Sequence, residues 1–111
     1  MITDLSYLKS LASDDESFIR DMINIFNEQI EEYKTEMPVL LENADYDKLS
    51  MMAHKAKSSV AVMGMSAEAE ILQKLEIMAK SGDGVDRYGK MIEQILEKMD
   101  AAIDELEQAY P

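Results

Sequence analysis

Residues 45–64 read DYDKLSMMAHKAKSSVAVMG, and apolar side chains recur in this segment every three or four positions, as on one face of an α-helix. Asp45 is suited to cap the N-terminus of such a helix, because its carboxylate can accept a hydrogen bond from a first-turn N–H group. Gly64 can end the helix in the left-handed conformation that glycine adopts easily. The residues of the apolar face are Leu49, Met52, Ala53, Ala56, Val60 and Met63.

The sequence before this segment predicts two more helices. The first is short, runs from Asp4 to about Leu11, and places three leucines on one side, Leu5, Leu8 and Leu11. The second follows a group of residues that supply N-cap chemistry and first-turn acids, Ser13, Asp14 and Asp15. Its apolar stripe is long and consists of Ile19, Met22, Ile23, Phe26, Ile30, Tyr33, Met37 and Leu41.

Pro38 interrupts the stripe of the second helix. A proline inside a helix removes one hydrogen bond and clashes with the preceding turn. The second helix therefore either kinks at Pro38, or ends near Glu36 with a new turn that starts at the proline.

The sequence after residue 64 also predicts two helices, separated by the turn Ser81-Gly82-Asp83-Gly84. The first begins with Ser66 and the acidic Glu68, and its apolar residues are Ile71, Leu72, Leu75, Met78 and Ala79. The second carries Val85, Tyr88, Ile92, Ile95, Leu96, Met99, Ile103 and Leu106. Short connections favour antiparallel neighbours. The predicted fold is all-α, an antiparallel up-down-up-down four-helix bundle with a short extra N-terminal helix packed across it.

Length and composition agree with one domain over residues 1–111, because 47% of the 111 residues are hydrophobic. The chain has no cysteine, which excludes disulfides and thiolate sites. A formal net charge of −12 disfavours nucleic acid as a partner. The longest apolar run, residues 60–65, is too short to span a bilayer, and the N-terminus lacks a secretion signal. We therefore expect a soluble, cytoplasmic protein with no membrane partner.

The only histidine of the chain, His54, is expected to point away from the core. A helix turns about 100° per residue, which places His54 roughly 140° from the apolar face of its helix. Lys57 and Ser58 flank the ring on the next turn, and Ser50 and Ala61 lie close to the same line. The imidazole would thus stand on an exposed strip of small side chains, which another protein can approach closely.

The charge pattern around His54 differs from that of the whole chain. The chain contains 23 acidic residues, yet residues 48–67 contain none. The same window holds Lys48, Lys55 and Lys57. We expect a locally positive face that favours an incoming phosphoryl group and the acidic pocket of a partner.

These residue types suit phosphoryl transfer. A neutral imidazole, with a reference pKa of about 6.5, is a competent nucleophile that can attack an aspartyl phosphate to form phosphohistidine. The ammonium group of Lys57 can offset charge on the transferring oxygens. The strip supplies no carboxylate cluster for Mg²⁺, so we expect no resident cofactor or metal and expect Mg²⁺ to come from the partner. The chain also lacks a glycine-rich phosphate loop, so we expect neither ATP binding nor autonomous kinase activity.

The run His54-x-x-Lys57-Ser58-Ser59, followed by Met63-Gly64-Met65 and then Leu75-Glu76, resembles the signature of histidine phosphotransfer (HPt) domains. The resemblance covers nearly the whole chain, since the order and lengths of the helices also match. It implies a bundle whose exposed histidine relays phosphate between receiver domains in multi-step two-component signalling. His54 is then the phosphoacceptor and Lys57 the phosphate-facing lysine. The implied partners are response-regulator receiver domains and a hybrid sensor kinase, with a monomer as the usual state of the family.

The resemblance also assigns supporting roles. Ser58 stands where the family usually has glycine, directly below the ring, and Ser59 beside it is expected to act sterically. Glu76 falls where some members use glutamine to hold the second nitrogen of the imidazole. A carboxylate there can accept an N–H bond and favour the tautomer whose other nitrogen is free. Lys80, one turn further on, adds positive charge.

Partner docking is assigned to side chains around the histidine and on one flank of the second helix, namely Ser50, Met51, Lys55, Ala61, Phe18 and Ile25. Phe18 and Ile25 lie off the main stripe, where either Leu5 and Leu8 cover them or they form an apolar docking patch. This flank also motivates an alternative function, a non-catalytic helical adaptor that binds a receiver without accepting phosphate. A metal-dependent hydrolase fits poorly, because one histidine and no clustered acids leave few ligands.

Overall fold

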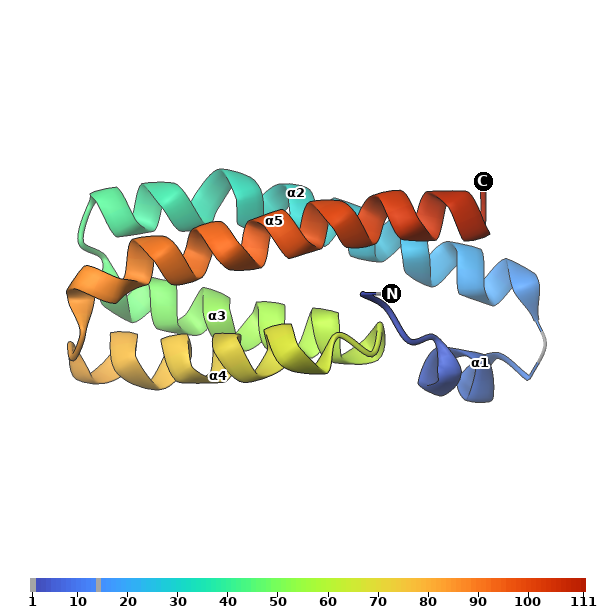
Figure 1. Ribbon diagram of the computed structural model, residues 1–111, viewed down its shortest axis with the longest axis horizontal. Helices are drawn as coiled ribbons and strands as arrows, with labels where there is room; N and C mark the ends of the chain where they lie inside the picture. Colours follow the sequence, from blue (N-terminus) through green and yellow to red (C-terminus); the bar gives the residue numbers. More distant parts are fainter. Residues whose placement is uncertain (1, 14) are drawn as a thin grey trace.

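The computed structural model describes residues 2–13 and 15–111, and this part of the chain forms helices without any strand. The helices are α1 (Ser6–Ala12), α2 (Glu16–Glu42), α3 (Tyr46–Val62), α4 (Ser66–Ser81) and α5 (Val85–Ala109). The four long helices lie antiparallel to their sequence neighbours (Figure 1). The predicted all-α bundle with a short N-terminal helix is confirmed.

Unequal helix lengths explain where the N-terminal helix packs. Helices α2 and α5 have 27 and 25 residues, whereas α3 and α4 have 17 and 16. At 1.5 Å per residue, the longer pair extends about 15 Å beyond the shorter pair. Helix α1 lies beyond the end of the α3–α4 hairpin, beside the part of α2 that this hairpin leaves uncovered (Figure 1). Leu8 of α1 is completely buried there.

Local sequence signals set the helix ends. The carboxylates of Asp15 and Asp45 cap α2 and α3, each accepting a 3.3 Å hydrogen bond from a backbone N–H group three residues later. Asp14, the other acid predicted at the start of the second helix, lies outside the described residues. Gly64 has a φ of +70° and follows the end of α3, as predicted. A side chain at Gly64 would overlap the carbonyl oxygen of Asp4, whose N–H donates to the carbonyl of Met63.

Helix α2 continues through Pro38 to Glu42. Of the two alternatives, an end near Glu36 is therefore wrong. Met37 is completely buried and Leu41 half-buried, so the apolar stripe continues on both sides of the proline. Packing of this stripe against α5 holds the last turns of the helix together even though Pro38 removes one hydrogen bond.

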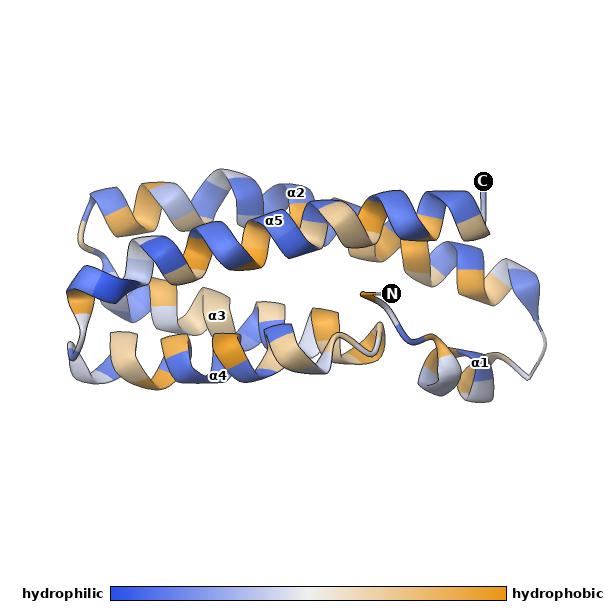
Figure 2. Ribbon diagram, viewed as in Figure 1, coloured by the Kyte–Doolittle hydropathy of each residue, from blue (hydrophilic) through white to orange (hydrophobic). Residues whose placement is uncertain are grey.

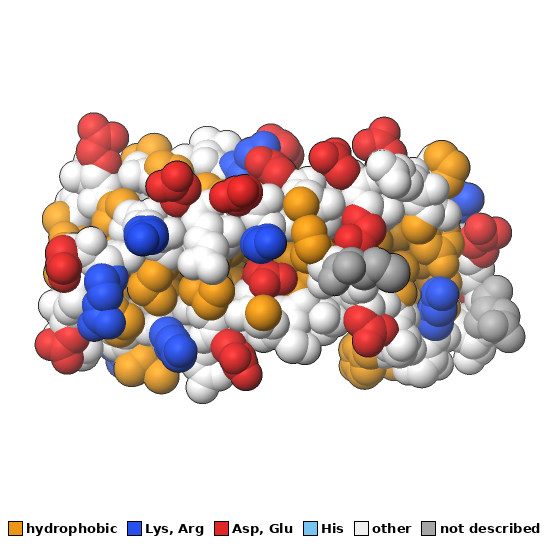
Figure 3. All heavy atoms as spheres, in the orientation of Figure 1, with side chains coloured by type: hydrophobic (Ala, Val, Ile, Leu, Met, Phe, Trp, Pro, Cys, Tyr) orange, Lys and Arg blue, Asp and Glu red, His pale blue; other side chains and the backbone are white. Residues whose placement is uncertain are grey.

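The core is built from one face of each helix (Figure 2). Two predicted core positions are wrong, because Leu11 is 53% exposed and Val85 is 38% exposed. The seven-residue α1 buries the pair Leu8 and Ala12, which leaves Leu11 at the edge, and Val85 is the first residue of α5. On the face shown in Figure 3, charged side chains of both signs are interspersed with small apolar areas.

No helix among the described residues has both the length and the apolar character that crossing a membrane would require.

Candidate functional site

His54 lies on the outward face of α3, and 63% of its side-chain surface is exposed. Lys57 lies one turn further along the same helix and is half-buried, and Ser58 is exposed. The predicted outward position of the histidine is confirmed. Ala53 and Ala56, on either side of His54, face the core, so the helical repeat turns the ring at position 54 outward.

The carboxylate of Glu76, on α4, joins His54 to Lys57. Nδ1 of the imidazole lies 3.2 and 3.1 Å from the two carboxylate oxygens, and Nζ of Lys57 donates to one of them at 3.1 Å. Because an ionised carboxylate only accepts, Nδ1 must carry the hydrogen of this bond. Nε2, the other ring nitrogen, has no hydrogen-bond partner within residues 2–13 and 15–111.

Glu76 is itself held by Ser50. The Ser50 hydroxyl donates a 2.7 Å hydrogen bond to the backbone carbonyl of Glu76, and Ser50 is only 7% exposed. The prediction that Ser50 lies on the exposed strip is therefore wrong. Helix α4 packs closely against this side of α3, so the strip is covered at Ser50 and opens only from Met51 and His54 onwards.

The charges of this site are balanced. Burial raises the pKa of the Glu76 carboxyl, but hydrogen bonds from Lys57 and His54 outweigh it and lower the pKa overall. Each lysine of the acid-free window lies within ion-pair distance of a carboxylate from outside the window. The pairs are Lys48–Asp45 at 3.7 Å, Lys55–Glu32 at 2.9 Å and Lys57–Glu76 at 3.1 Å. The predicted excess of positive charge beside the histidine is therefore wrong, because acids from neighbouring segments reach this face.

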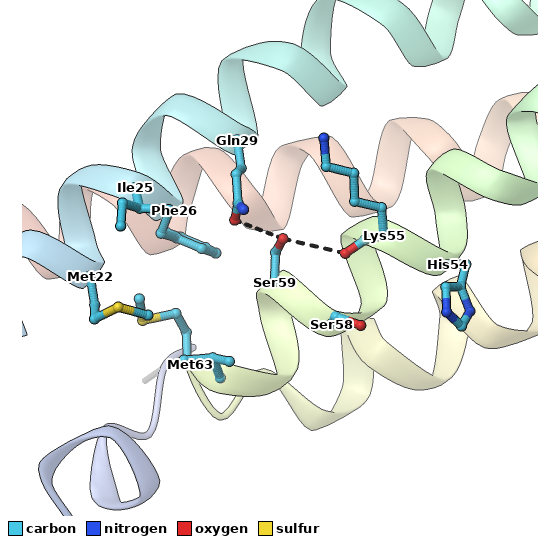
Figure 4. A pocket seen from close by; sticks show the side chains of 10 residues that line it. Met22, Ile25, Phe26, Gln29, His54, Lys55, Ser58, Ser59 and Met63 are labelled. Atoms are coloured by element: carbon cyan, nitrogen blue, oxygen red, sulfur yellow. Dashed lines mark hydrogen bonds between the residues drawn. The ribbon is translucent and has the colours of Figure 1, made fainter. Parts of the chain in front are cut away.

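His54 stands between two hollows. A groove of about 410 Å³ runs between α2 and α3, with apolar side chains gathered at the end away from the histidine (Figure 4). Its lining consists of Met22, Ile25, Phe26, Gln29, His54, Lys55, Ser58, Ser59, Val62 and Met63. A second hollow of about 430 Å³ lies between α3 and α4 and is lined by Asp47, Ser50, Met51, His54, Glu76 and Lys80. The structure thus brings Lys80 to the same hollow as the imidazole.

The other residues predicted for docking are on the surface. Phe18 is 36% exposed and Ile25 is 46% exposed, so the first helix does not cover them. Met51 is 72% exposed, and Ala61 and Lys55 are also exposed. Of these residues, Ile25 and Lys55 line the α2–α3 groove, whereas Phe18 and Ala61 lie outside its lining.

A hydrogen-bond network below the groove was not anticipated from the sequence. Buried Ser59 donates to Oε1 of Gln29 at 2.8 Å, and its oxygen lies 2.7 Å from the hydroxyl of Tyr33 (Figure 4 shows the bond to Gln29). Since Ser59 has one hydrogen and donates it to Gln29, Tyr33 donates to Ser59. Burial raises the pKa of the Tyr33 hydroxyl, although the Ser59 bond opposes this shift. The available signal was Tyr33 itself, because a tyrosine in a buried stripe needs a partner for its hydroxyl.

The described residues contain no group of three or more histidine, aspartate or glutamate side chains placed to hold a metal ion. The described side chains at this site place one exposed imidazole, oriented through Nδ1, near two ammonium groups.

A four-helix bundle with a single exposed imidazole on α3 has the architecture of a histidine phosphotransfer domain. The comparison with protein families agrees, since the model of the Hpt domain matches residues 21–109. The chain belongs to this family. The matched range contains His54, Lys57 and Glu76.

The chain is also similar to the phosphorelay intermediate protein YPD1 of Candida albicans, with 26% identity over 98 residues. The alignment covers 88% of this chain and 52% of the relative, so the chain spans about half the length of the curated relative it matches. No solved structure matches the chain significantly.

Proposed function

We propose that this chain is a phosphorelay intermediate in multi-step two-component signalling. His54 accepts a phosphoryl group from a receiver-domain aspartate and passes it to another receiver. Membership of the Hpt family and similarity to a phosphorelay intermediate support this class of function. The observation that carries the choice of site is the exposed His54 ring, whose Nδ1 is bonded to Glu76 and whose Nε2 is free of partners within the described part of the chain.

The tautomer fixed by Glu76 decides which ring nitrogen reacts. With the hydrogen on Nδ1, the lone pair of a neutral ring is on Nε2 and points away from the carboxylate. Nε2 attacks the phosphorus of the aspartyl phosphate, a new N–P bond forms, and the O–P bond breaks with its electron pair going to the aspartate. The reverse reaction on a second receiver completes the relay.

Lys57 and Lys80 supply positive charge to the transferring group. Nζ of Lys57 is paired with Glu76, and its flexible stem lets it turn towards a phosphoryl group on Nε2. Lys80 lines the adjacent hollow and forms no ion pair with any described residue. Both ammonium groups can therefore offset the charge of the phosphoryl oxygens as these approach His54.

The receiver partner supplies the remaining chemistry. Mg²⁺ and the acidic pocket come from the receiver, and this chain acts as a phosphocarrier without kinase activity of its own. The phosphoryl group originates from a hybrid sensor kinase, and the chain works as a cytoplasmic monomer. The apolar end of the α2–α3 groove, where Ile25 and Met22 lie, offers the receiver a docking surface beside the reactive ring.

The direct test uses receiver domains of the same organism, labelled with radioactive phosphate on their aspartates. We expect an acid-labile, alkali-stable label to appear on the wild type and not on His54→Gln. Failure of every labelled receiver to transfer would reject the relay, and labelled His54→Gln would reject the site. Binding of His54→Ala to a receiver separates the relay from a pure adaptor, whose whole output would survive that substitution.

A further inference from the structure

Glu76 holds the ring from a rigid position. Its side chain is about three-quarters buried, its backbone carbonyl accepts a hydrogen bond from buried Ser50, and both its carboxylate oxygens lie 3.1–3.2 Å from Nδ1 of His54. The contact therefore presents a full negative charge to one particular ring nitrogen. A glutamine at this position would accept the same hydrogen bond without that charge.

The proton on Nδ1 matters most after phosphoryl transfer. When the lone pair of Nε2 bonds to phosphorus, the ring becomes a cation that still carries hydrogen on Nδ1. That hydrogen is then either lost to solvent or retained. If it is retained, the N–P bond can break with its electron pair going to Nε2, and a neutral imidazole leaves. If it is lost, the same cleavage must expel an imidazolate anion, which is a far poorer leaving group.

We propose that Glu76 retains the Nδ1 proton of phosphorylated His54 and so keeps the phosphoryl group ready for transfer. The inference rests on the proposed function and assigns Glu76 as a positioning residue that acts through His54. An opposite charge at this distance favours the charged form of its neighbour. The lowered pKa of the Glu76 carboxyl keeps it ionised at neutral pH.

The other charged groups near the ring do not replace this effect. From α3, Lys57 is bonded to Glu76, and Asp47 lines the hollow beside the ring. Lys55 is paired with Glu32 of α2, and Lys80 of α4 carries the same charge as a protonated ring. When Lys57 turns to the phosphoryl oxygens, Glu76 loses one cation, and its attraction for the protonated ring becomes stronger. Phosphorylation thus reinforces the contact that holds the proton.

The test loads His54 with phosphoramidate, a small-molecule phosphoryl donor, and so needs no receiver. Hydrolysis of the phosphorylated protein is followed by phosphorus NMR between pH 6 and 10 for wild type, Glu76→Gln and Glu70→Gln, which neutralises an exposed acid of the same helix. We expect the pH at which the hydrolysis rate falls to half of its maximum, the midpoint of the profile, to be lower in Glu76→Gln than in wild type by about one unit. At pH values above both midpoints, phosphohistidine in Glu76→Gln should have a roughly tenfold longer half-life than in wild type, and Glu70→Gln should follow the wild type. Identical pH profiles for all three proteins would overturn the proposal.

A second measurement needs no substitution. Nitrogen NMR of the ring in phosphorylated wild type should give a titration midpoint for Nδ1 about one unit above that of free phosphohistidine. A midpoint equal to that of the free compound would also overturn the inference, even if Glu76→Gln did not fold. The outcome that would reject the proposed function is a different one, because the relay requires phosphoryl transfer from receivers and the role of Glu76 does not. Labelling by phosphoramidate with no transfer from any receiver would reject the relay while the pH profiles still report on Glu76.

Discussion

The hydroxyl of Tyr33 on α2 lies 2.7 Å from the hydroxyl of Ser59 on α3, and both residues are buried below the groove that leads to His54. The Ser59 hydroxyl donates a hydrogen bond to Gln29 of α2, so one serine joins two side chains of the neighbouring helix. Polar groups in such a position must remain paired, because an unpaired buried hydroxyl is costly. This network fixes the spacing of α2 and α3 beside the reactive ring.

Replacing Ser59 with alanine should destabilise the protein. The substitution leaves the buried Tyr33 hydroxyl without its partner, and we expect the free energy of unfolding to fall by about 1–3 kcal/mol. Ser58→Ala is the matched control, because Ser58 is exposed on the same turn and should change stability by less than about 0.5 kcal/mol. Urea denaturation followed by circular dichroism measures both. Equal midpoints for the two variants would contradict the role given to the network.

Lys57→Ala should slow phosphoryl transfer and leave the fold intact. The substitution removes an ammonium group whose charge opposes that of the transferring oxygens, and we expect a loss of about tenfold or more in the single-turnover rate. Lys48→Ala controls for a general loss of positive charge, because Lys48 lies on the same helix and, among the described residues, pairs with Asp45 alone. If both variants transfer at the wild-type rate, Lys57 takes no part in the chemistry.

Helical periodicity was enough to predict the bundle and the outward position of His54, because both follow from the repeat of one helix. It failed at Ser50, since the angle around α3 says nothing about α4, which covers that position. It failed also for the charge of the site, because Glu32 and Glu76 reach the lysines from other helices. Glu76 lies 22 residues from His54, and only the family resemblance pointed to their contact.

The stability of the N-terminal segment should depend on pH through Glu105. Its carboxylate accepts hydrogen bonds from the backbone N–H groups of Ile2 and Thr3, at 2.8 and 3.1 Å, and from the Thr3 hydroxyl at 2.6 Å. Hydrogen bonding to Ile2, followed by that to the Thr3 side chain, lowers the pKa of Glu105 in the folded state. Because the pKa of Glu105 is lower in the folded state, ionised Glu105 contributes its full stabilisation above the pKa of the unfolded state, about 4.3. This stabilisation is lost as the pH falls through the pKa of the folded state.

Glu105→Gln should therefore be less stable than the wild type at pH 7, by about 1 kcal/mol, and the difference should shrink below roughly pH 4. Glu107→Gln, an exposed acid on the same helix, provides the comparison and should follow the wild type throughout. Unfolding free energies measured between pH 3 and 7 decide the matter. A constant difference between Glu105→Gln and the wild type over this range would rule out the ionised contact.

Gly64 and Gly82 form a natural pair for testing how α1 is attached. Both have positive φ, +70° and +79°, so alanine at either position is strained by about 1 kcal/mol. An added side chain meets nothing at Gly82, whereas at Gly64 it overlaps the backbone of Asp4. Gly64→Ala should therefore cost about 1–3 kcal/mol more than Gly82→Ala and should increase hydrogen exchange around α1. Equal losses of stability would mean that the contact with Asp4 adjusts freely.

Ile25 should govern receiver docking. It is 46% exposed and lines the α2–α3 groove, so an apolar contact from the receiver can bury it beside His54. Ile25→Ser should weaken binding about fivefold or more, since truncating a side chain that is buried at the centre of an interface costs over about 1 kcal/mol. Val39→Ser is the matched control, because Val39 is 50% exposed on the same helix but lies outside the groove lining. Calorimetry with a receiver domain compares the two. Equal affinities would move the docking surface away from this groove, whereas loss of binding with Ile25→Ser alone would place the receiver over the apolar end of the groove and within reach of the Nε2 atom of His54.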